Sequence, residues 1–158
     1  MKKLNYLWML GLLMFAAVNF SACSSDDDEA PGAASELVGL WERVSTKGWE
    51  KMNGKIDYEW DEEGEDKLRV RLNSDGTFAE YDGYNGEWYL DGSGTWEYKN
   101  GKIYTTIYDE YDEEYETAFA TVKELSSSRF ALEMTWKEVY EGDTWEGYSY
   151  DVYKKVGE

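Results

Sequence analysis

The sequence contains no histidine, one cysteine and one proline. Without histidine the chain cannot build a Ser-His-Asp or Cys-His catalytic centre, and a single cysteine cannot make a His/Cys zinc site. That cysteine, Cys23, has no partner for a disulfide within the chain, so the fold is held by its core alone. Acidic residues are so numerous that no pair stands out as the two carboxylates of a glycosidase. The sequence therefore predicts a protein that is not an enzyme.

Basic residues are scarce relative to acidic ones: 16 Lys and Arg stand against 34 Asp and Glu, a formal net charge of −18. A surface of this sign repels phosphate, which argues against nucleic-acid binding and against attachment to anionic lipid through the protein's own surface. High acidity can accompany disorder, but aromatic residues make up 17% of the chain and supply apolar area to bury. We therefore expect a folded, acidic domain without a nucleic-acid partner.

The N-terminal residues have the layout of a secretory signal peptide. Lys2 and Lys3 precede a mostly apolar run, Tyr6–Val18, which is too short to span a bilayer comfortably as a helix. Phe20-Ser21-Ala22-Cys23 resembles a bacterial lipobox, which implies cleavage before the cysteine and attachment of lipid to it. The acidic run from Ser24 to Glu29 is similar to the export tag of surface lipoproteins in one Gram-negative phylum. The alternative is an ordinary signal peptide followed by a free thiol.

These features divide the chain into three parts. Residues 1–22 are the predicted signal peptide, and residues 23–36 are a flexible acidic linker that begins at the lipidated Cys23 and contains Pro31. Residues 37–156, roughly 120 residues, suit one domain with its own core. We expect a monomer that is anchored by lipid in the outer membrane and exposed on the cell surface.

The domain shows strand after strand and little sign of a helix. Lys67–Leu72 alternates strictly between apolar and basic side chains, which is the pattern of a half-buried strand. Asn100-Gly101 between two alternating segments predicts a tight hairpin. We expect about eight strands joined by short turns and closed into an antiparallel up-and-down barrel. Residues 48–66 are expected to form a long loop over one mouth, with 56–60 as a short strand. Residues 83–94 are expected to be irregular, with a brief strand pairing at 88–90.

Three segments resemble those of a known family. Leu37-Val38-Gly39-Leu40-Trp41 resembles the Gly-x-Trp opening of lipocalins, and Asn73–Phe78 and Gly94–Tyr98 are similar to segments of short bacterial lipocalin-like lipoproteins. The resemblance implies an all-β, eight-stranded barrel that holds a small apolar or amphipathic ligand in its open mouth, without a cofactor. The family's closing arginine, which packs on the first-strand tryptophan, is absent, and Lys154 or Lys155 is the candidate to replace it.

Aromatic rings at alternating positions form the candidate site. In a barrel of this size such rings either fill the core or line a cavity for a lipid, pigment or sugar. The rings expected to face the interior are Trp41, Phe78, Trp96, Tyr98, Phe130, Trp136, Tyr148 and Tyr150. The predicted ligand-binding residues among them are Trp41, Trp96, Tyr98, Trp136, Tyr148 and Tyr150. The opposite face is expected to carry Tyr104, Tyr108 and Tyr153.

A second hypothesis uses aromatic residues outside the barrel. Trp49, Trp60 and Trp88 fall in predicted loops, where exposed indoles would hold a glycan or a neighbouring envelope protein. Two acidic clusters, at residues 61–66 and 109–116, offer the oxygen ligands that calcium prefers, but neither matches an EF-hand loop. We interpret both clusters as solvated loops and predict no metal site.

Overall fold

The computed structural model describes residues 33–64, 67–109 and 113–158. The predicted signal peptide, the lipidation site Cys23 and most of the linker lie outside the described residues. The described part begins with a short helix, α1 (Ala33–Leu37), which takes in the end of the predicted linker. The described residues contain no helix that is long and apolar enough to cross a membrane.

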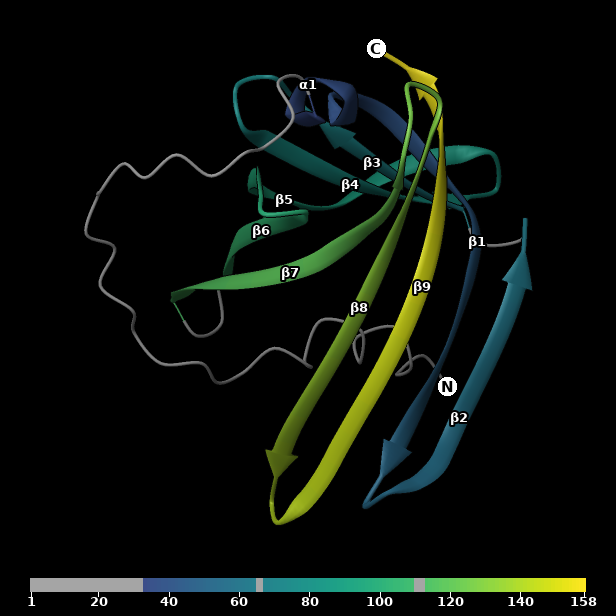
Figure 1. Ribbon diagram of the computed structural model, residues 1–158, viewed down its shortest axis with the longest axis vertical. Coiled ribbons are helices and arrows are strands. Elements are labelled where there is room, and N and C mark those ends of the chain that lie inside the picture. The colour runs from purple at the N-terminus through teal and green to yellow at the C-terminus, as the bar shows by residue number, and fades with distance from the viewer. Residues whose placement is uncertain (1–32, 65–66, 110–112) are drawn as a thin grey trace.

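Nine strands follow α1 in the described residues, and every pairing between them is antiparallel (Figure 1). They are β1 (Gly39–Met52), β2 (Lys55–Glu63), β3 (Leu68–Leu72), β4 (Thr77–Tyr84), β5 (Glu87–Lys99), β6 (Lys102–Asp109), β7 (Glu114–Leu125), β8 (Arg129–Tyr140) and β9 (Asp143–Gly157). Strands β3 to β9 pair in chain order, and β1 pairs with both β3 and β9. This closure confirms the predicted eight-stranded, all-β up-and-down barrel, to which β2 is an addition.

The barrel continues on one side as a projecting wall. The pairing of β1 with β3 ends at Glu42, after which β1 pairs with β2, and the pairing of β8 with β7 ends at Glu133. The far halves of β8, β9, β1 and β2 therefore extend beyond the closed part as a four-stranded sheet, the projecting wall, at the lower right of Figure 1. The short strand predicted at residues 56–60 is confirmed as part of β2, but the long loop predicted around it is wrong, because most of residues 48–66 belong to the end of β1 and to β2.

The hairpins turn at dipeptides with left-handed backbone angles. The predicted hairpin at Asn100-Gly101 is confirmed, with φ angles of 53° and 72°. Asn53-Gly54 has nearly the same angles, 53° and 77°, and joins β1 to β2. Asn85-Gly86 joins β4 to β5 in the same way, so residues 83–94 form paired strands and not the irregular segment predicted. Asparagine and glycine tolerate these angles, which match the twist of a two-residue hairpin.

Apolar side chains fill the barrel at the end near α1. Trp41 is fully buried, packs edge-on against Phe130 with ring centroids 4.6 Å apart, and donates its indole N–H to the Leu37 carbonyl oxygen at 2.7 Å. Phe130 in turn stacks on Tyr153 at 4.7 Å. The ammonium of Lys155 lies 5.5 Å from the centre of the Trp41 ring, so Lys155 takes the place expected for the closing arginine. These contacts close this end of the barrel.

Strand pairing shows which rings face the interior, and it corrects part of the prediction. The inward prediction for Tyr148 and Tyr150 is wrong: on β9 the inner positions are Ser149, Asp151 and Tyr153, and Tyr153 is buried in the core instead of lying outside. In the projecting half of β9 the inward side chains are small or polar and the outward ones are more hydrophobic. A prediction that turns the hydrophobic side chains inward is therefore wrong there. The rings on the inner face as predicted are Trp41, Phe78, Trp96, Tyr98, Phe130 and Trp136.

Candidate functional site

Ionisable side chains form a layer inside the barrel, next to its apolar end. Glu80 follows Phe78 on the inner face of β4 and pairs with Val70, and Asp151 precedes the core residue Tyr153 on β9. Arg43 of β1 pairs with Tyr153, and its Nη1 lies 4.0 Å from Asp151 Oδ1, with both side chains largely buried. Buried charges are costly unless they are paired, so this layer is not explained by core packing.

The electrostatics of this layer are dominated by burial and by neighbouring carboxylates. Burial and, to a smaller extent, the negative charge of Asp91 raise the pKa of Glu80 to about 7, against the guanidinium of Arg43, which acts in the opposite direction. The pKa of Asp151 is raised by burial, against a hydrogen bond from Thr46 and the charge of Arg43. Burial and Asp91 also raise the pKa of Asp82. We call Glu80, Asp82, Asp91 and Asp151, grouped around Arg43, the acidic cluster.

On the inner face of the projecting wall, two indole rings lie directly over Gly48 and Gly147, which we call the glycine floor. Trp60 lies against Gly48 and Trp136 against Gly147, so closely that a Cβ on either glycine would overlap the ring. The Trp60 indole N–H donates to the hydroxyl of Thr46 at 3.0 Å. The wall therefore presents aromatic surface next to the acidic cluster, and glycine is required because the rings lie on the backbone.

A buried hydroxyl lies between the two indoles and the acidic cluster. Ser149 is 1% exposed and is placed on β9 between Gly147 and Asp151, on the same inner face. Its Oγ has no hydrogen-bond partner among the described residues, and neither does Asp151 Oδ1. Buried polar atoms normally find partners, so Ser149 Oγ remains available to a donor from outside the chain, whereas Asp151 Oδ1 already faces the Arg43 guanidinium at 4.0 Å.

Comparison with known proteins agrees with this architecture. The model of the lipocalin-like domain family matches residues 37–132. The chain belongs to this family. The fold of a lipocalin-like domain indicates a ligand-binding role, and such proteins are generally binding proteins and not enzymes. No curated protein matches the chain.

Two solved structures from Bacteroides resemble this lipocalin-like domain. The crystal structure of a lipocalin-like protein from Bacteroides uniformis is 17% identical, with a TM-score of 0.48, and the match covers 77% of this chain and 99% of that one. The crystal structure of an uncharacterized protein from Bacteroides eggerthii is 16% identical, with a TM-score of 0.42, and covers 75% of this chain and 98% of that one.

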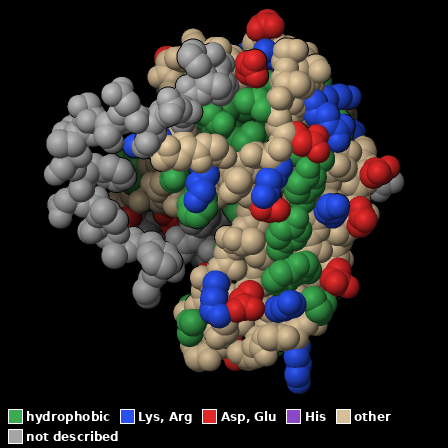
Figure 2. All heavy atoms as spheres, viewed as in Figure 1, with side chains coloured by type: hydrophobic (Ala, Val, Ile, Leu, Met, Phe, Trp, Pro, Cys, Tyr) green, Lys and Arg blue, Asp and Glu red, His purple; other side chains and the backbone are tan. Residues whose placement is uncertain are grey.

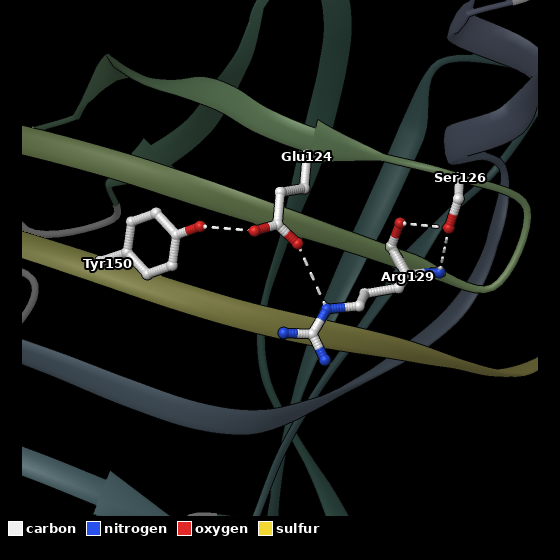
Figure 3. A network of polar contacts seen from close by, with 4 residues as sticks. All are labelled: Glu124, Ser126, Arg129 and Tyr150. Carbon is white, nitrogen blue, oxygen red and sulfur yellow. Dashed lines mark hydrogen bonds and ion pairs between the residues drawn. The ribbon is translucent and has the colours of Figure 1, made fainter.

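The outer face of this lipocalin-like domain carries a cross-strand ladder of rings and charges, along the projecting wall and the adjoining part of the barrel. Tyr148 stacks on Trp49 with ring centroids 6.3 Å apart, and the Lys51 ammonium lies 4.0 Å from the centre of the Trp49 ring. Tyr150 donates its hydroxyl to Glu124 at 3.2 Å, and Arg129 donates to the same carboxylate (Figure 3). Figure 2 shows hydrophobic side chains interleaved with charged ones over this side of the molecule. These contacts stabilise the sheet, and the ring faces that make them pack against side chains of the same domain.

Two shallow depressions on the outside of the lipocalin-like domain are lined by tryptophans of the second hypothesis. One, of about 470 Å³, runs along Trp49 and Tyr148, with Lys47 and Glu59 at its sides. The other, of about 300 Å³, lies where β1 leaves β3 and includes Trp88, whose ring is covered by the Arg69 guanidinium at 3.9 Å. All three of these tryptophans lie in strands and not in the predicted loops, and Trp60 is buried.

The structure thus separates the six predicted ligand-binding residues. Trp41 is core, Trp96 and Tyr98 pack against the core, Trp136 lies on the inner wall, and Tyr148 and Tyr150 lie outside. Sequence reasoning missed the acidic cluster, Arg43 and Ser149. Alternation from Phe78 would have placed Glu80 inside, and alternation from Trp41 would have placed Arg43 inside. Beyond Arg43 a β-bulge shifts the alternation of β1, so that Thr46 and Gly48 become the inner positions. No three acidic or cysteine side chains in the described part of the chain are arranged to hold a metal.

Replacing Gly147 by alanine is expected to lower the free energy of unfolding by about 1–3 kcal/mol, because the new Cβ would overlap the Trp136 indole. In a Trp136→Ala background the same change should cost much less, since the overlapping ring is gone. Urea denaturation of the four proteins of this cycle measures the coupling. An equal cost of Gly147→Ala with and without Trp136 would contradict the glycine floor.

Glu80→Gln is expected to change stability in a pH-dependent way. The pKa of Glu80 is about 7 in the folded protein against an ordinary 4.5, because Glu80 is buried and faces Asp82, Asp91 and Asp151 as well as Arg43. The contribution of protonated Glu80 to the free energy of unfolding is therefore fully present below pH 4.5, and it is lost as the pH rises through about 7. The variant should match the wild type at pH 4 and exceed it by up to about 3 kcal/mol at pH 8, in urea denaturation.

The matched control for this measurement is Glu59→Gln, because Glu59 is an exposed carboxylate on the outside of β2. It is expected to follow the wild type at both pH values. A Glu80→Gln variant whose stability differs from the wild type by the same amount at pH 4 and pH 8 would show that Glu80 is not a buried, protonated carboxyl.

Proposed function

We propose that the protein is a surface lipoprotein whose lipocalin-like domain binds a small amphipathic molecule at the mouth of the barrel. The observation that supports this most is the position of the acidic cluster. Ionisable groups inside a barrel destabilise a purely structural core, whereas a binding site needs a few polar groups beside apolar walls. The cluster lies between the closed apolar end and the two indoles of the wall, so one bound molecule would contact both.

Membrane attachment in this proposal comes from lipid on Cys23. The segment Phe20-Ser21-Ala22-Cys23 supports it, and the acidic run after the cysteine supports display on the outer face of the outer membrane. The folded domain itself carries a large excess of acidic residues and would be repelled by anionic lipid, so the anchor is needed to hold it there.

The second hypothesis, a glycan or protein partner held by Trp49, Trp60 and Trp88, has less geometric support. Lys51 and Tyr148 contact the ring of Trp49, Arg69 covers Trp88, and Trp60 lies on the inner face. Rings that stack on sugars need an open face. The mouth of the barrel is therefore the better candidate.

Ligand binding is expected to change indole fluorescence through Trp136. Purified protein titrated with decanol, decanoate, decylammonium or deoxycholate, each below its micellar concentration, should give a saturable change with at least one of them. Trp136→Phe should reduce the amplitude of this change, because the ring lies on the inner wall. Trp49→Phe, on the outer face of the same wall, should leave it unchanged. A response that depends on Trp49 and not on Trp136 would favour the outer surface instead.

Lipid anchoring is expected to depend on Cys23 alone. In a bacterial host that processes lipoproteins, Cys23→Ser should move the protein from the membrane fraction to the soluble fraction, and intact mass should show lipid on the wild type only. Changing Asp26, Asp27 and Asp28 together to asparagine should keep the protein in the membrane but remove its sensitivity to added protease on intact cells. An unmodified Cys23 in membranes would contradict the anchor.

A further inference from the structure

We infer that the mouth of the barrel is selective for an organic cation, a protonated amine that carries an apolar body. This inference rests on the proposed ligand binding at the mouth and specifies the ligand's chemistry. Three observations carry it: the imbalance of charge in the acidic cluster, the arrangement of its carboxylates, and a buried hydroxyl beside the indoles.

The first observation is the charge imbalance on the inner face. Glu80, Asp82 and Asp151 lie at inner positions of β4 and β9, and Asp91 lies at the adjoining bulge of β5. The positive charge that acts on the first three is the guanidinium of Arg43. Asp151 lies near that guanidinium, and Asp82 and Asp91 remain exposed to solvent. A cation entering here would meet an excess of negative charge in a partly desolvated place, where electrostatic attraction is strong, and an anion would be repelled.

The second observation is that the carboxylates come from three strands and are not arranged as metal ligands. Glu80 and Asp82 belong to β4, Asp91 to β5 and Asp151 to β9. Within the described residues no three such groups are arranged to hold a metal ion. A metal ion needs several oxygens at once, at short and uniform distances, whereas an organic cation spreads its charge and its N–H donors over a larger volume. The arrangement fits an organic cation better.

The third observation is a buried hydroxyl without a hydrogen-bond partner. Ser149 Oγ is buried on the inner face of β9 and has no hydrogen-bond partner among the described residues, and beside it Asp151 Oδ1 has only the Arg43 guanidinium, at 4.0 Å. An ammonium group has up to three donors and no acceptor, so it complements such atoms. The partly exposed ring of Trp136 lies on the neighbouring glycine floor, where an indole face attracts both cations and apolar chains.

Proton release provides a readout that a merely structural cluster would lack. A bound cation favours the ionised form of Glu80, whose neighbours are Asp82, Asp91, Asp151 and Arg43. Binding of a cation near pH 7 should therefore release protons, whereas binding of a neutral molecule should not. In calorimetry, proton release appears as a binding enthalpy that depends on the ionisation enthalpy of the buffer.

The test compares three ligands with the same chain: decylammonium, decanol and decanoate, titrated calorimetrically into the protein at pH 7 and about 0.15 M salt, which screens the net charge of the whole surface. We expect decylammonium to bind at least roughly tenfold more tightly than decanol, with proton release, and decanoate to bind most weakly.

Variants of the acidic cluster test the source of this selectivity. Glu80→Gln and Asp151→Asn should each lower the affinity for decylammonium by roughly tenfold and leave the affinity for decanol unchanged. Combined, they should abolish the difference between the two ligands. Glu59→Gln on the outer face is the matched control and should change nothing.

Each other outcome has a definite meaning. If decanol binds as tightly as decylammonium, cation selectivity is wrong although binding at the mouth survives. If none of the three ligands binds, this inference fails, and if deoxycholate does not bind either, the proposed function fails with it. If Glu59→Gln weakens decylammonium as much as Glu80→Gln does, the attraction belongs to the general surface and the inference is wrong. Should Asp151→Asn fold poorly, Asp82→Asn at an exposed position replaces it, with a smaller loss of decylammonium affinity expected.

Discussion

The pairing of β1 is the interaction on which both parts of the molecule depend. Its first residues pair with β3 and β9 and close the barrel, and its last residues pair with β2 and β9 and form the wall. The bulge between Arg43 and Ser45 lies where one role changes to the other. A bulge adds a residue and increases the local twist, which turns the strand away from β3. It also keeps Trp41 and Arg43 inside the barrel and Thr46 and Gly48 inside the wall.

This arrangement separates stability from binding along one axis. The buried contacts of Trp41 with Leu37, Phe130 and Lys155 lie at the closed end, where apolar burial supplies most of the stability. The acidic cluster lies beyond them, and ionising Glu80 there reduces stability. A closed apolar end can offset that cost, which is the usual relation between a rigid scaffold and a strained or charged site.

Sequence patterns predicted the fold well wherever local chemistry determines geometry. Asn100-Gly101 predicted its hairpin because few other residues adopt the angles required, and the strict alternation of Lys67–Leu72 predicted a half-buried strand. Asn53-Gly54 carries the same turn signal, and applying it there would have replaced the predicted loop by the hairpin of β1 and β2. The site was harder to predict because the wall inverts the usual pattern. Tyr148 and Tyr150 are outside while Ser149 and Asp151 are inside, since aromatic rings from other strands cover the inner backbone.

This inversion itself points to function. A strand that served only the core would place its tyrosines inward and its serine and aspartate toward water, because each exchange would bury more apolar area and fewer polar atoms. On β9 the opposite holds along the wall, and the buried Ser149 Oγ has no hydrogen-bond partner in the described chain. Gly48 and Gly147 show a related cost, since glycine weakens a strand and is retained here under Trp60 and Trp136. Polar atoms, glycines and indoles that each disfavour simple packing occur together on one face, and a bound molecule that uses the acceptors and the rings would account for all three.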